Sequence, residues 1–221
     1  MNWRAINWAL TALGLVSVAA APAQAATFVL GDSIGTGVAL AAQAAQVKSL
    51  AKISVHIRGP KAVAQIAATP PGSTAFLVLG TNDAEGSIAK LDKSIDDIVE
   101  AAGKRNITLI WMGPPCVRKA WDTRARALDV MLRDKLASTS VRYVSMRDDE
   151  MCSGALHEPD GVHLKMRGYT HMWHKAAAVA GIELPPPPPP KEKPARTRTA
   201  ALKKGERIPL PVPRRPPPGL D

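Results

Sequence analysis

The chain has 221 residues, of which 46% are hydrophobic, and this suits one domain with a real core plus appendages. Its formal net charge is +10, but nine basic and three acidic residues fall within positions 185–221. The charge therefore belongs largely to that segment, and it gives no reason to expect a nucleic-acid-binding domain.

The N-terminal segment, residues 1–25, has the features of a secretory signal peptide. Arg4 precedes an uncharged apolar run from Trp8 to Ala20, and Ala23-Gln24-Ala25 is a small-x-small cleavage site. The run is short for a bilayer span, which needs about 20 residues, although a retained anchor stays open as an alternative. We expect an exported protein, periplasmic or secreted, that is soluble from about Ala26 and has no stable membrane insertion.

Apolar strands and helices alternate through residues 26–184. The clearest helix places apolar residues at three- and four-residue steps between Ile88 and Val99. The expected strands are 27–30, 53–57, 75–79, 107–111 and 141–145, and the other expected helices are 34–48, 60–68, 123–136 and 165–180. This alternation predicts one α/β domain with a five-stranded parallel sheet that is covered by helices on both faces.

Residues 185–221 form a segment of a different kind. Thirteen of the 20 prolines lie there, and the six in a row from Pro185 to Pro190 favour a stiff polyproline II rod. The remainder mixes proline with lysine and arginine, so we expect a disordered tail. Its charge would draw it to an anionic envelope polymer. A partner that recognises polyproline and a passive spacer stay open as alternatives.

Polar motifs follow the ends of several expected strands. Gly31-Asp32-Ser33 follows the first strand, Gly59 follows the second, and Gly80-Thr81-Asn82-Asp83 follows the third. Asp160-Gly161-Val162-His163 lies in the loop after the fifth. Parallel sheets bind ligands outside the carboxyl ends of their strands, so we expect these residues to gather at one edge.

The residue types in these motifs suit acyl transfer to a serine. A serine hydroxyl becomes a nucleophile when a histidine removes its proton and a carboxylate orients that histidine. Ser33, His163 and Asp160 are therefore the candidates for nucleophile, base and orienting acid. The backbone N–H groups of Ser33 and Gly59 and the amide of Asn82 are candidates for an oxyanion hole. Taken singly, each motif also fits a helix cap or a polar turn.

Taken together, the four motifs resemble those of the SGNH/GDSL hydrolase family in type and in order, over the span Thr27 to Ala180. The resemblance implies a flavodoxin-like three-layer α/β/α sandwich. It also implies ester hydrolysis through an acyl-enzyme, without metal or cofactor, in which the named residues keep the roles given above. Ile34 replaces the leucine that more commonly follows the serine in the family, and Gly59 belongs to the loosest of the four matches.

The sequence therefore predicts a hydrolase of carboxylic esters. A short acyl group such as acetyl, on envelope or extracellular carbohydrate, is the preferred substrate class, because the body is small and shows no apolar lid. Three alternatives stay open: an O-acyltransferase with the same triad, a lipase or thioesterase for long acyl chains, and a non-enzymatic envelope-binding module that works through the basic tail.

The cysteines and the remaining histidines allow more than one interpretation. Cys116 and Cys152 are compatible with one disulfide in an exported chain, and two separately buried thiols are the alternative. His171 and His174 lack further ligands nearby, so we expect a surface or core role and no metal. His157 either lines the pocket or simply lies in the loop.

Aromatic and basic residues beside the expected site leave two questions. Trp111, Met112 and Trp121 are candidates for a substrate pocket, although Trp111 ends a strand and fits the core equally well. A basic set either faces solvent or attracts an anionic substrate, and it consists of Arg118, Lys119, Arg124 and Arg126.

Overall fold

The computed structural model describes residues 26–184. The segments interpreted as a signal peptide and as a basic proline-rich tail lie outside the described residues. Within residues 26–184, none of the helices combines the length and the hydropathy that a membrane span requires.

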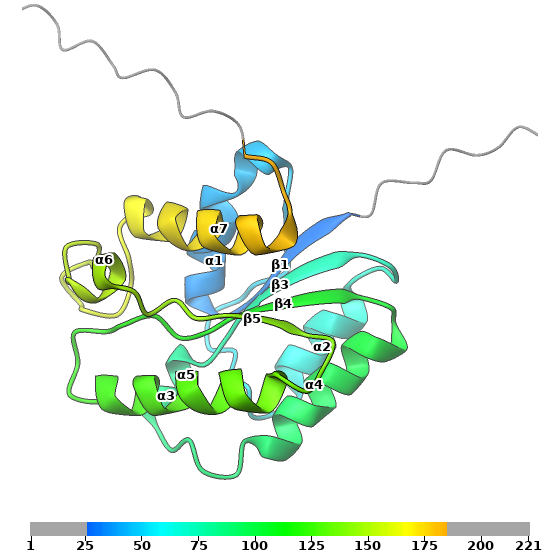
Figure 1. Ribbon diagram of the computed structural model, residues 1–221, viewed down its shortest axis with the longest axis horizontal. Coiled ribbons are helices and arrows are strands. Elements are labelled where there is room, and N and C mark those ends of the chain that lie inside the picture. Colours follow the sequence, from blue (N-terminus) through cyan, green and yellow to red (C-terminus); the bar gives the residue numbers. More distant parts are fainter. Residues whose placement is uncertain (1–25, 185–221) are drawn as a thin grey trace, which may run out of the picture. The chain divides into compact units, whose positions relative to one another are not determined.

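Five parallel strands form a single sheet in the order β2-β1-β3-β4-β5 (Figure 1). The order reverses beside β1, because the chain first moves outward to β2 and then crosses back to β3 on the other side. Such a switch leaves a crevice outside the carboxyl ends of β1 and β3. The strands are β1 (Thr27–Gly31), β2 (Lys48–Ser49), β3 (Thr74–Val78), β4 (Thr108–Met112) and β5 (Arg142–Val144).

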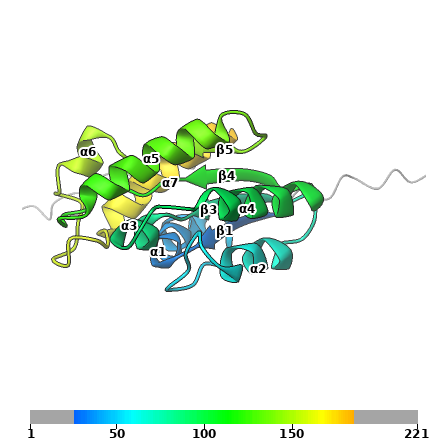
Figure 2. The same ribbon diagram turned by 90° about the horizontal axis from the view of Figure 1, so that it is seen from below.

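Helices cover both faces of this sheet (Figure 1). One face carries α1 (Ser33–Ala41) and α7 (Met166–Ala180), and the other carries α2 (Pro60–Ala68), α4 (Asp92–Lys104) and α5 (Asp122–Leu136). Figure 2 looks onto the face with α2, α4 and α5. Three short elements complete the described chain: the 3-10 helix η1 (Gln43–Ala45), α3 (Thr81–Glu85) and α6 (Asp149–Cys152). This is the three-layer sandwich with a five-stranded parallel sheet that the sequence predicts, and the prediction is confirmed.

The core follows from the alternation of side chains along the central strands. Successive strand residues point to opposite faces, so Leu77 and Trp111 pack under α2, α4 and α5 while Phe76 and Ile110 pack under α1 and α7. Phe76 meets Trp173 of α7 edge-on, with ring centroids 5.0 Å apart. Burial of each such side chain contributes roughly 1.5–3 kcal/mol to the stability of the fold. Because both sets of side chains are apolar, these strands could be predicted from the sequence.

The first crossover differs from the prediction. The helix expected over 34–48 ends at Ala41, and the second strand is Lys48–Ser49, which pairs with β1, whereas 53–57 forms no strand. The chain keeps alongside β1 as far as Lys52, whose N–H donates to the carbonyl of Gly31 at 3.0 Å. The prediction of the second strand was therefore wrong by several residues.

The reason lies in where the backbone of 53–57 finds its hydrogen bonds. Val55 and Ile57 are buried, as their apolar character requires. The carbonyl of Val55, however, accepts from Nδ2 of Asn82 at 2.9 Å, and the N–H of Ile57 donates to Oδ2 of Asp83 at 2.9 Å. Side chains of α3 thus make the hydrogen bonds that a neighbouring strand would otherwise make. The apolar pattern of 53–57 indicates burial, but it does not indicate strand pairing.

Candidate active site

Ser33 lies at the start of α1, directly after β1. Gly31 ends the strand at φ +117°, and a Cβ at this position would overlap the backbone of Val78 in β3. The next residue, Asp32, donates its N–H to the carbonyl of Val78 at 3.1 Å. Glycine at 31 therefore lets the chain turn while it stays against β3, and the turn leaves the half-buried Ser33 at the carboxyl edge of the sheet.

Asp32 caps the helix that Ser33 begins. Its Oδ1 accepts from the N–H of Ile34 at 2.9 Å and from that of Gly35 at 3.4 Å. The side chain is wholly buried, and Oδ2 has no hydrogen-bond partner among the described residues. Burial raises the pKa of Asp32 to about 7, against the two N–H donors, which lower it. A carboxyl group that is protonated over much of the acidic range therefore sits directly beside the candidate nucleophile.

His163 joins Ser33 to Asp160. Its Nε2 lies 3.0 Å from Oγ of Ser33, and its Nδ1 lies 2.6 Å from Oδ2 of Asp160. The other oxygen of Asp160 accepts from the N–H groups of Val162 and His163, both at 2.9 Å. The hydrogen bond from the His163 ring, followed by that from Val162, lowers the pKa of Asp160 to about 2. The charged carboxylate holds a proton on Nδ1 and leaves Nε2 to accept from the serine.

The loop that carries Asp160 and His163 is short and closed. His157 and Leu164 form an antiparallel bridge at its base. Near its tip, Gly161 has φ +71°, and its carbonyl accepts from the N–H of Arg118 at 2.7 Å. A Cβ at position 161 would lie 3.0 Å from Cβ of Arg118, so glycine permits this close approach.

Asn82 lies at the carboxyl end of β3, the strand next to β1. It is half-buried on α3, and its Nδ2 donates one proton to the carbonyl of Val55. A side-chain amide carries two such protons, so a second donor remains for a ligand. This segment, for which a polar turn was the alternative to an oxyanion-hole role, is a short helix that presents an amide at the sheet edge.

Gly59 follows residues 55–58, whose backbone is hydrogen-bonded to side chains of α3. Asp83, which is almost wholly buried, accepts from the N–H groups of Ile57 and Arg58 at 2.9 and 3.4 Å. Gly59 then takes φ +98° and immediately precedes α2, and nothing lies within 4 Å of where its Cβ would be. The requirement for glycine is therefore one of backbone conformation, and α3 ties this position to the residues around Asn82.

The aromatic candidates for a pocket belong to the core. Trp111 and Met112 are wholly buried, and the indole N–H of Trp111 donates to the carbonyl of Leu79 at 3.3 Å. Trp121 is half-buried and packs against the same core. Of the two interpretations of Trp111, the core one is confirmed.

The basic set is only partly available to a ligand. Arg124 donates to the carbonyls of Ala84 and Glu85 at 2.9 and 2.8 Å, so it fastens α5 to α3. Arg118 and Lys119 are exposed.

The remaining histidines have protein partners or face solvent. His171 binds Asp148 at 2.9 Å, and His174 is exposed. Nowhere in residues 26–184 do three His, Cys, Asp or Glu side chains gather in an arrangement for a metal ion.

Three residues near the site make buried contacts that the sequence did not predict. Asp32 and Asp83 were parts of motifs whose neighbours drew attention, although their burial makes them the supports of the site. His157 is also buried, and its Nε2 lies 2.6 Å from the carbonyl of Cys116. Cys116 and Cys152 are joined by a disulfide, with Cα atoms 5.1 Å apart. Of the two interpretations of the cysteines, the disulfide is the one that the structure shows. The contact between His157 and Cys116 has no signal in the sequence, because it joins segments that are distant in the chain.

Neither a protein-family model nor a curated protein sequence matches the chain. Solved structures do match it. A protein of the G-D-S-L family from Desulfitobacterium hafniense is 17% identical, with 69% of this chain and 98% of that one covered and a TM-score of 0.57. The catalytic domain of peptidoglycan O-acetyltransferase A from Streptococcus pneumoniae is 17% identical, with 71% and 94% covered and a TM-score of 0.55.

A catalytic mutant of Axe2, an acetylxylan esterase from Geobacillus stearothermophilus, is 12% identical, with 72% of this chain and 95% of that one covered and a TM-score of 0.57. Each of these three structures is thus covered almost in full by about seven tenths of this chain. The chain has the SGNH/GDSL hydrolase fold, as its four motifs predict.

Proposed function

We propose that the protein is a serine hydrolase of carboxylic esters, with Ser33 as nucleophile, His163 as base and Asp160 as its orienting acid. The observation that carries the proposal is the pair of contacts at His163, 3.0 Å to Oγ of Ser33 and 2.6 Å to Oδ2 of Asp160. A histidine held by a charged carboxylate and in contact with a serine at the mouth of a helix is the arrangement that activates a hydroxyl. The SGNH/GDSL fold supports the same chemistry.

The proposed reaction has two halves. Oγ of Ser33 attacks the ester carbonyl while Nε2 of His163 takes its proton, and the charged Asp160 stabilises the imidazolium that results. The N–H groups of Ser33 and Gly59 and the free amide proton of Asn82 bind the oxyanion. His163 then protonates the departing alcohol. A water molecule releases the acyl group in the second half, again with His163 as base.

A short acyl group on carbohydrate is the proposed substrate class. Two of the similar structures are, by name, an acetylxylan esterase and a peptidoglycan O-acetyltransferase. The side chains of His163 and Asp160 are 44% and 50% exposed, which suits an ester on a bulky polymer. Export, expected from residues 1–25, would bring the enzyme to such polymers outside the cytoplasm.

An O-acyltransferase with the same triad is the second candidate, and the likeness to the O-acetyltransferase domain favours it. In this reaction a sugar hydroxyl replaces water in the second half. The two activities are separated by incubating the protein with an acetyl donor and a glycan acceptor and measuring free acetate against acetylated glycan.

The first experiment is hydrolysis of p-nitrophenyl acetate by the purified chain beside Ser33→Ala and His163→Ala. Loss of either group is expected to lower kcat by about 10⁶-fold. Ser94→Ala in α4 and His174→Ala on the exposed side of α7 are the matched controls and should keep full activity. A folded Ser33→Ala protein that hydrolyses the ester at the parent rate would refute the proposal. Activity on long-chain esters alone would instead favour a lipase or thioesterase.

A further inference from the structure

The segment that follows β4, residues 115–118, is fastened to the body of the domain; we call it the bracing segment. The carbonyl of Pro115 accepts from the Arg147 guanidinium at 3.1 Å. The N–H of Val117 donates to Oδ1 of Asp122 at 2.8 Å, at the start of α5. Arg147 and Asp122 are themselves paired at 2.7 Å. Two elements, α5 and the chain after β5, therefore hold this short segment in place.

The bracing segment in turn holds the loop with Asp160 and His163. The N–H of Arg118 donates to the carbonyl of Gly161, at the tip of that loop, at 2.7 Å. The carbonyl of Cys116 lies 2.6 Å from Nε2 of His157, at the base of the loop. The loop is thus held at its base and at its tip by Cys116 and Arg118, which are two positions apart and more than 40 positions from the loop in sequence.

His157 makes a bond that defines its tautomer. A carbonyl can only accept, so the contact with Cys116 requires the proton on Nε2. The side chain is 3% exposed, and Nδ1 has no hydrogen-bond partner among the described residues. A buried polar atom without a partner is unfavourable, so packing alone gives no reason for a histidine here, whereas the bond to Cys116 does.

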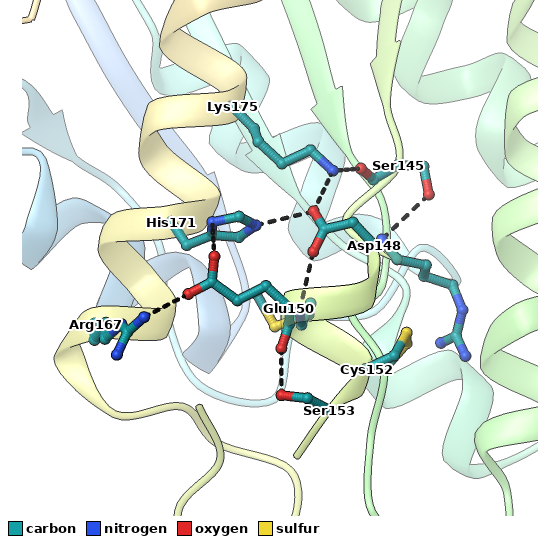
Figure 3. A network of polar contacts seen from close by, with 11 residues as sticks. Ser145, Asp148, Glu150, Cys152, Ser153, Arg167, His171 and Lys175 are labelled. Atoms are coloured by element: carbon teal, nitrogen blue, oxygen red, sulfur yellow. Dashed lines mark hydrogen bonds and ion pairs between the residues drawn. A yellow bond between two sulfur atoms is a disulfide. The ribbon is translucent and has the colours of Figure 1, made fainter. Parts of the chain in front are cut away.

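The disulfide anchors the bracing segment from its other side. Cys116 is bonded to Cys152, which ends the short helix α6. Figure 3 shows Cys152 beside the polar contacts of that helix. Asp148, which caps α6, accepts from Lys175 at 2.7 Å and from His171 at 2.9 Å, and both of these residues lie on α7. Partial burial works to raise the pKa of Asp148, but the hydrogen bonds from Lys175, the Met151 N–H and His171 outweigh it and hold this pKa below its usual range.

A second pair reinforces this connection. Glu150 of α6 binds Arg167 of α7 at 3.0 Å and faces the ring of His171 at 3.4 Å (Figure 3). Helix α7 begins two residues after Leu164, where the loop ends. Both ends of the loop are therefore tied, directly or through α6, to the same set of contacts.

We propose that His157 is a positioning residue for the active site. Its bond to Cys116, with the bond between Arg118 and Gly161, holds the loop so that His163 stays in reach of Ser33, and the disulfide keeps Cys116 in place for this bond. The inference rests on the proposed function of the triad. A displacement of about 1 Å in a reacting group can lower a rate by about 10²-fold, so the bond matters to catalysis although His157 contacts no reacting atom.

The test compares His157→Leu with His157→Gln in the full chain. Glutamine can place an Nε2 donor near the position of the imidazole Nε2, whereas leucine fills the space without a donor. We expect His157→Leu to lower kcat for p-nitrophenyl acetate by about 10²-fold with KM little changed, and His157→Gln to recover most of the loss. Ile98→Ala, a buried truncation in α4 on the opposite face of the sheet, is the control for lost packing and should keep the parent kcat while folded.

A readout that needs no catalysis accompanies the kinetics. Amide hydrogen exchange at Arg118, whose N–H binds Gly161, should be faster in His157→Leu and close to the parent in His157→Gln. If His157→Leu does not fold, the disulfide of the folded parent is reduced instead, since Cys152 is exposed although Cys116 is buried. Reduction should speed hydrogen exchange at the Arg118 amide and lower kcat.

Two results would overturn the proposal. One is parent-like kcat and parent-like exchange in His157→Leu, and the other is an equal loss of kcat in the Ile98→Ala control. Failure of the proposed function would give a different result, because the Ser33→Ala protein would then have the kcat of the parent. Amide hydrogen exchange at Arg118 would still decide whether His157 holds the loop.

Discussion

Replacing Asp32 by asparagine removes an ionisable group that is completely buried at the start of α1. The pKa of Asp32 is raised by burial from 3.8 to about 7. Between these values the carboxyl group is ionised in the unfolded chain and protonated in the folded one. The folded state then binds more protons at this group, so the contribution of Asp32 to stability is greatest at low pH and falls as the pH rises towards 7. Asparagine keeps an oxygen for the N–H groups of Ile34 and Gly35 but cannot ionise.

The size of the effect follows from the shift in pKa. Each unit corresponds to about 1.4 kcal/mol, so a shift of this size corresponds to about 4 kcal/mol. The free energy of unfolding of Asp32→Asn minus that of the parent should therefore increase by about 1.4 kcal/mol per pH unit from pH 4 to 7, and then level off. Ionisations shared by both proteins cancel in this difference.

Urea unfolding of the two proteins at several pH values between 4 and 8 measures this difference directly. Asp134→Asn, at an exposed position on α5, supplies the baseline for loss of a surface carboxylate. A difference between Asp32→Asn and the parent that stays constant across this range would refute the reasoning. It would mean that Asp32 is already ionised in the folded protein across this range.

Two further predictions follow from the site and its packing. Asn82→Ala should lower kcat by about 10²–10³-fold with the fold intact, because it removes a proposed oxyanion donor; steady-state kinetics beside circular dichroism test this, and an unchanged kcat excludes the role. Gly37→Ala should lower the free energy of unfolding by about 1–3 kcal/mol, because its Cβ would overlap the ring of Tyr169 where α1 packs on α7. Gly103→Ala is the matched control in α4, where the added Cβ meets nothing within 4 Å and should stabilise by up to about 1 kcal/mol; equal effects of the two changes in urea unfolding would contradict the packing argument.

Much of the architecture could be predicted from the sequence. The central strands β1, β3 and β4 are apolar on both faces because helices cover both sides, and such continuous apolar runs are distinctive. Helices α2, α5 and α7 also lie close to their expected bounds. The motifs that follow the strands could be placed at one edge of the sheet, because parallel strands all end on the same side.

The short edge strand β2 could not be predicted in this way. β2 has two exposed residues and no apolar signature, whereas 53–57 has the apolar signature and no strand. Val55 and Ile57 are buried for packing, and their backbone groups are satisfied by Asn82 and Asp83. Apolar pattern records burial, but the choice of hydrogen-bond partner is made by residues far away in the chain.

The candidate site also has features that the sequence predicts and features that only the tertiary structure determines. The residue types and order of Ser33, Asp160 and His163 were evident from local motifs, because acyl transfer needs these groups and the motifs carry them. The 3.0 Å contact between His163 and Ser33 spans 130 positions, and only the folded chain decides it. The burial that shifts the pKa of Asp32 and the bond from His157 to Cys116 are likewise tertiary. A sequence specifies which groups are present, whereas desolvation and hydrogen-bond geometry depend on what the rest of the fold places around them.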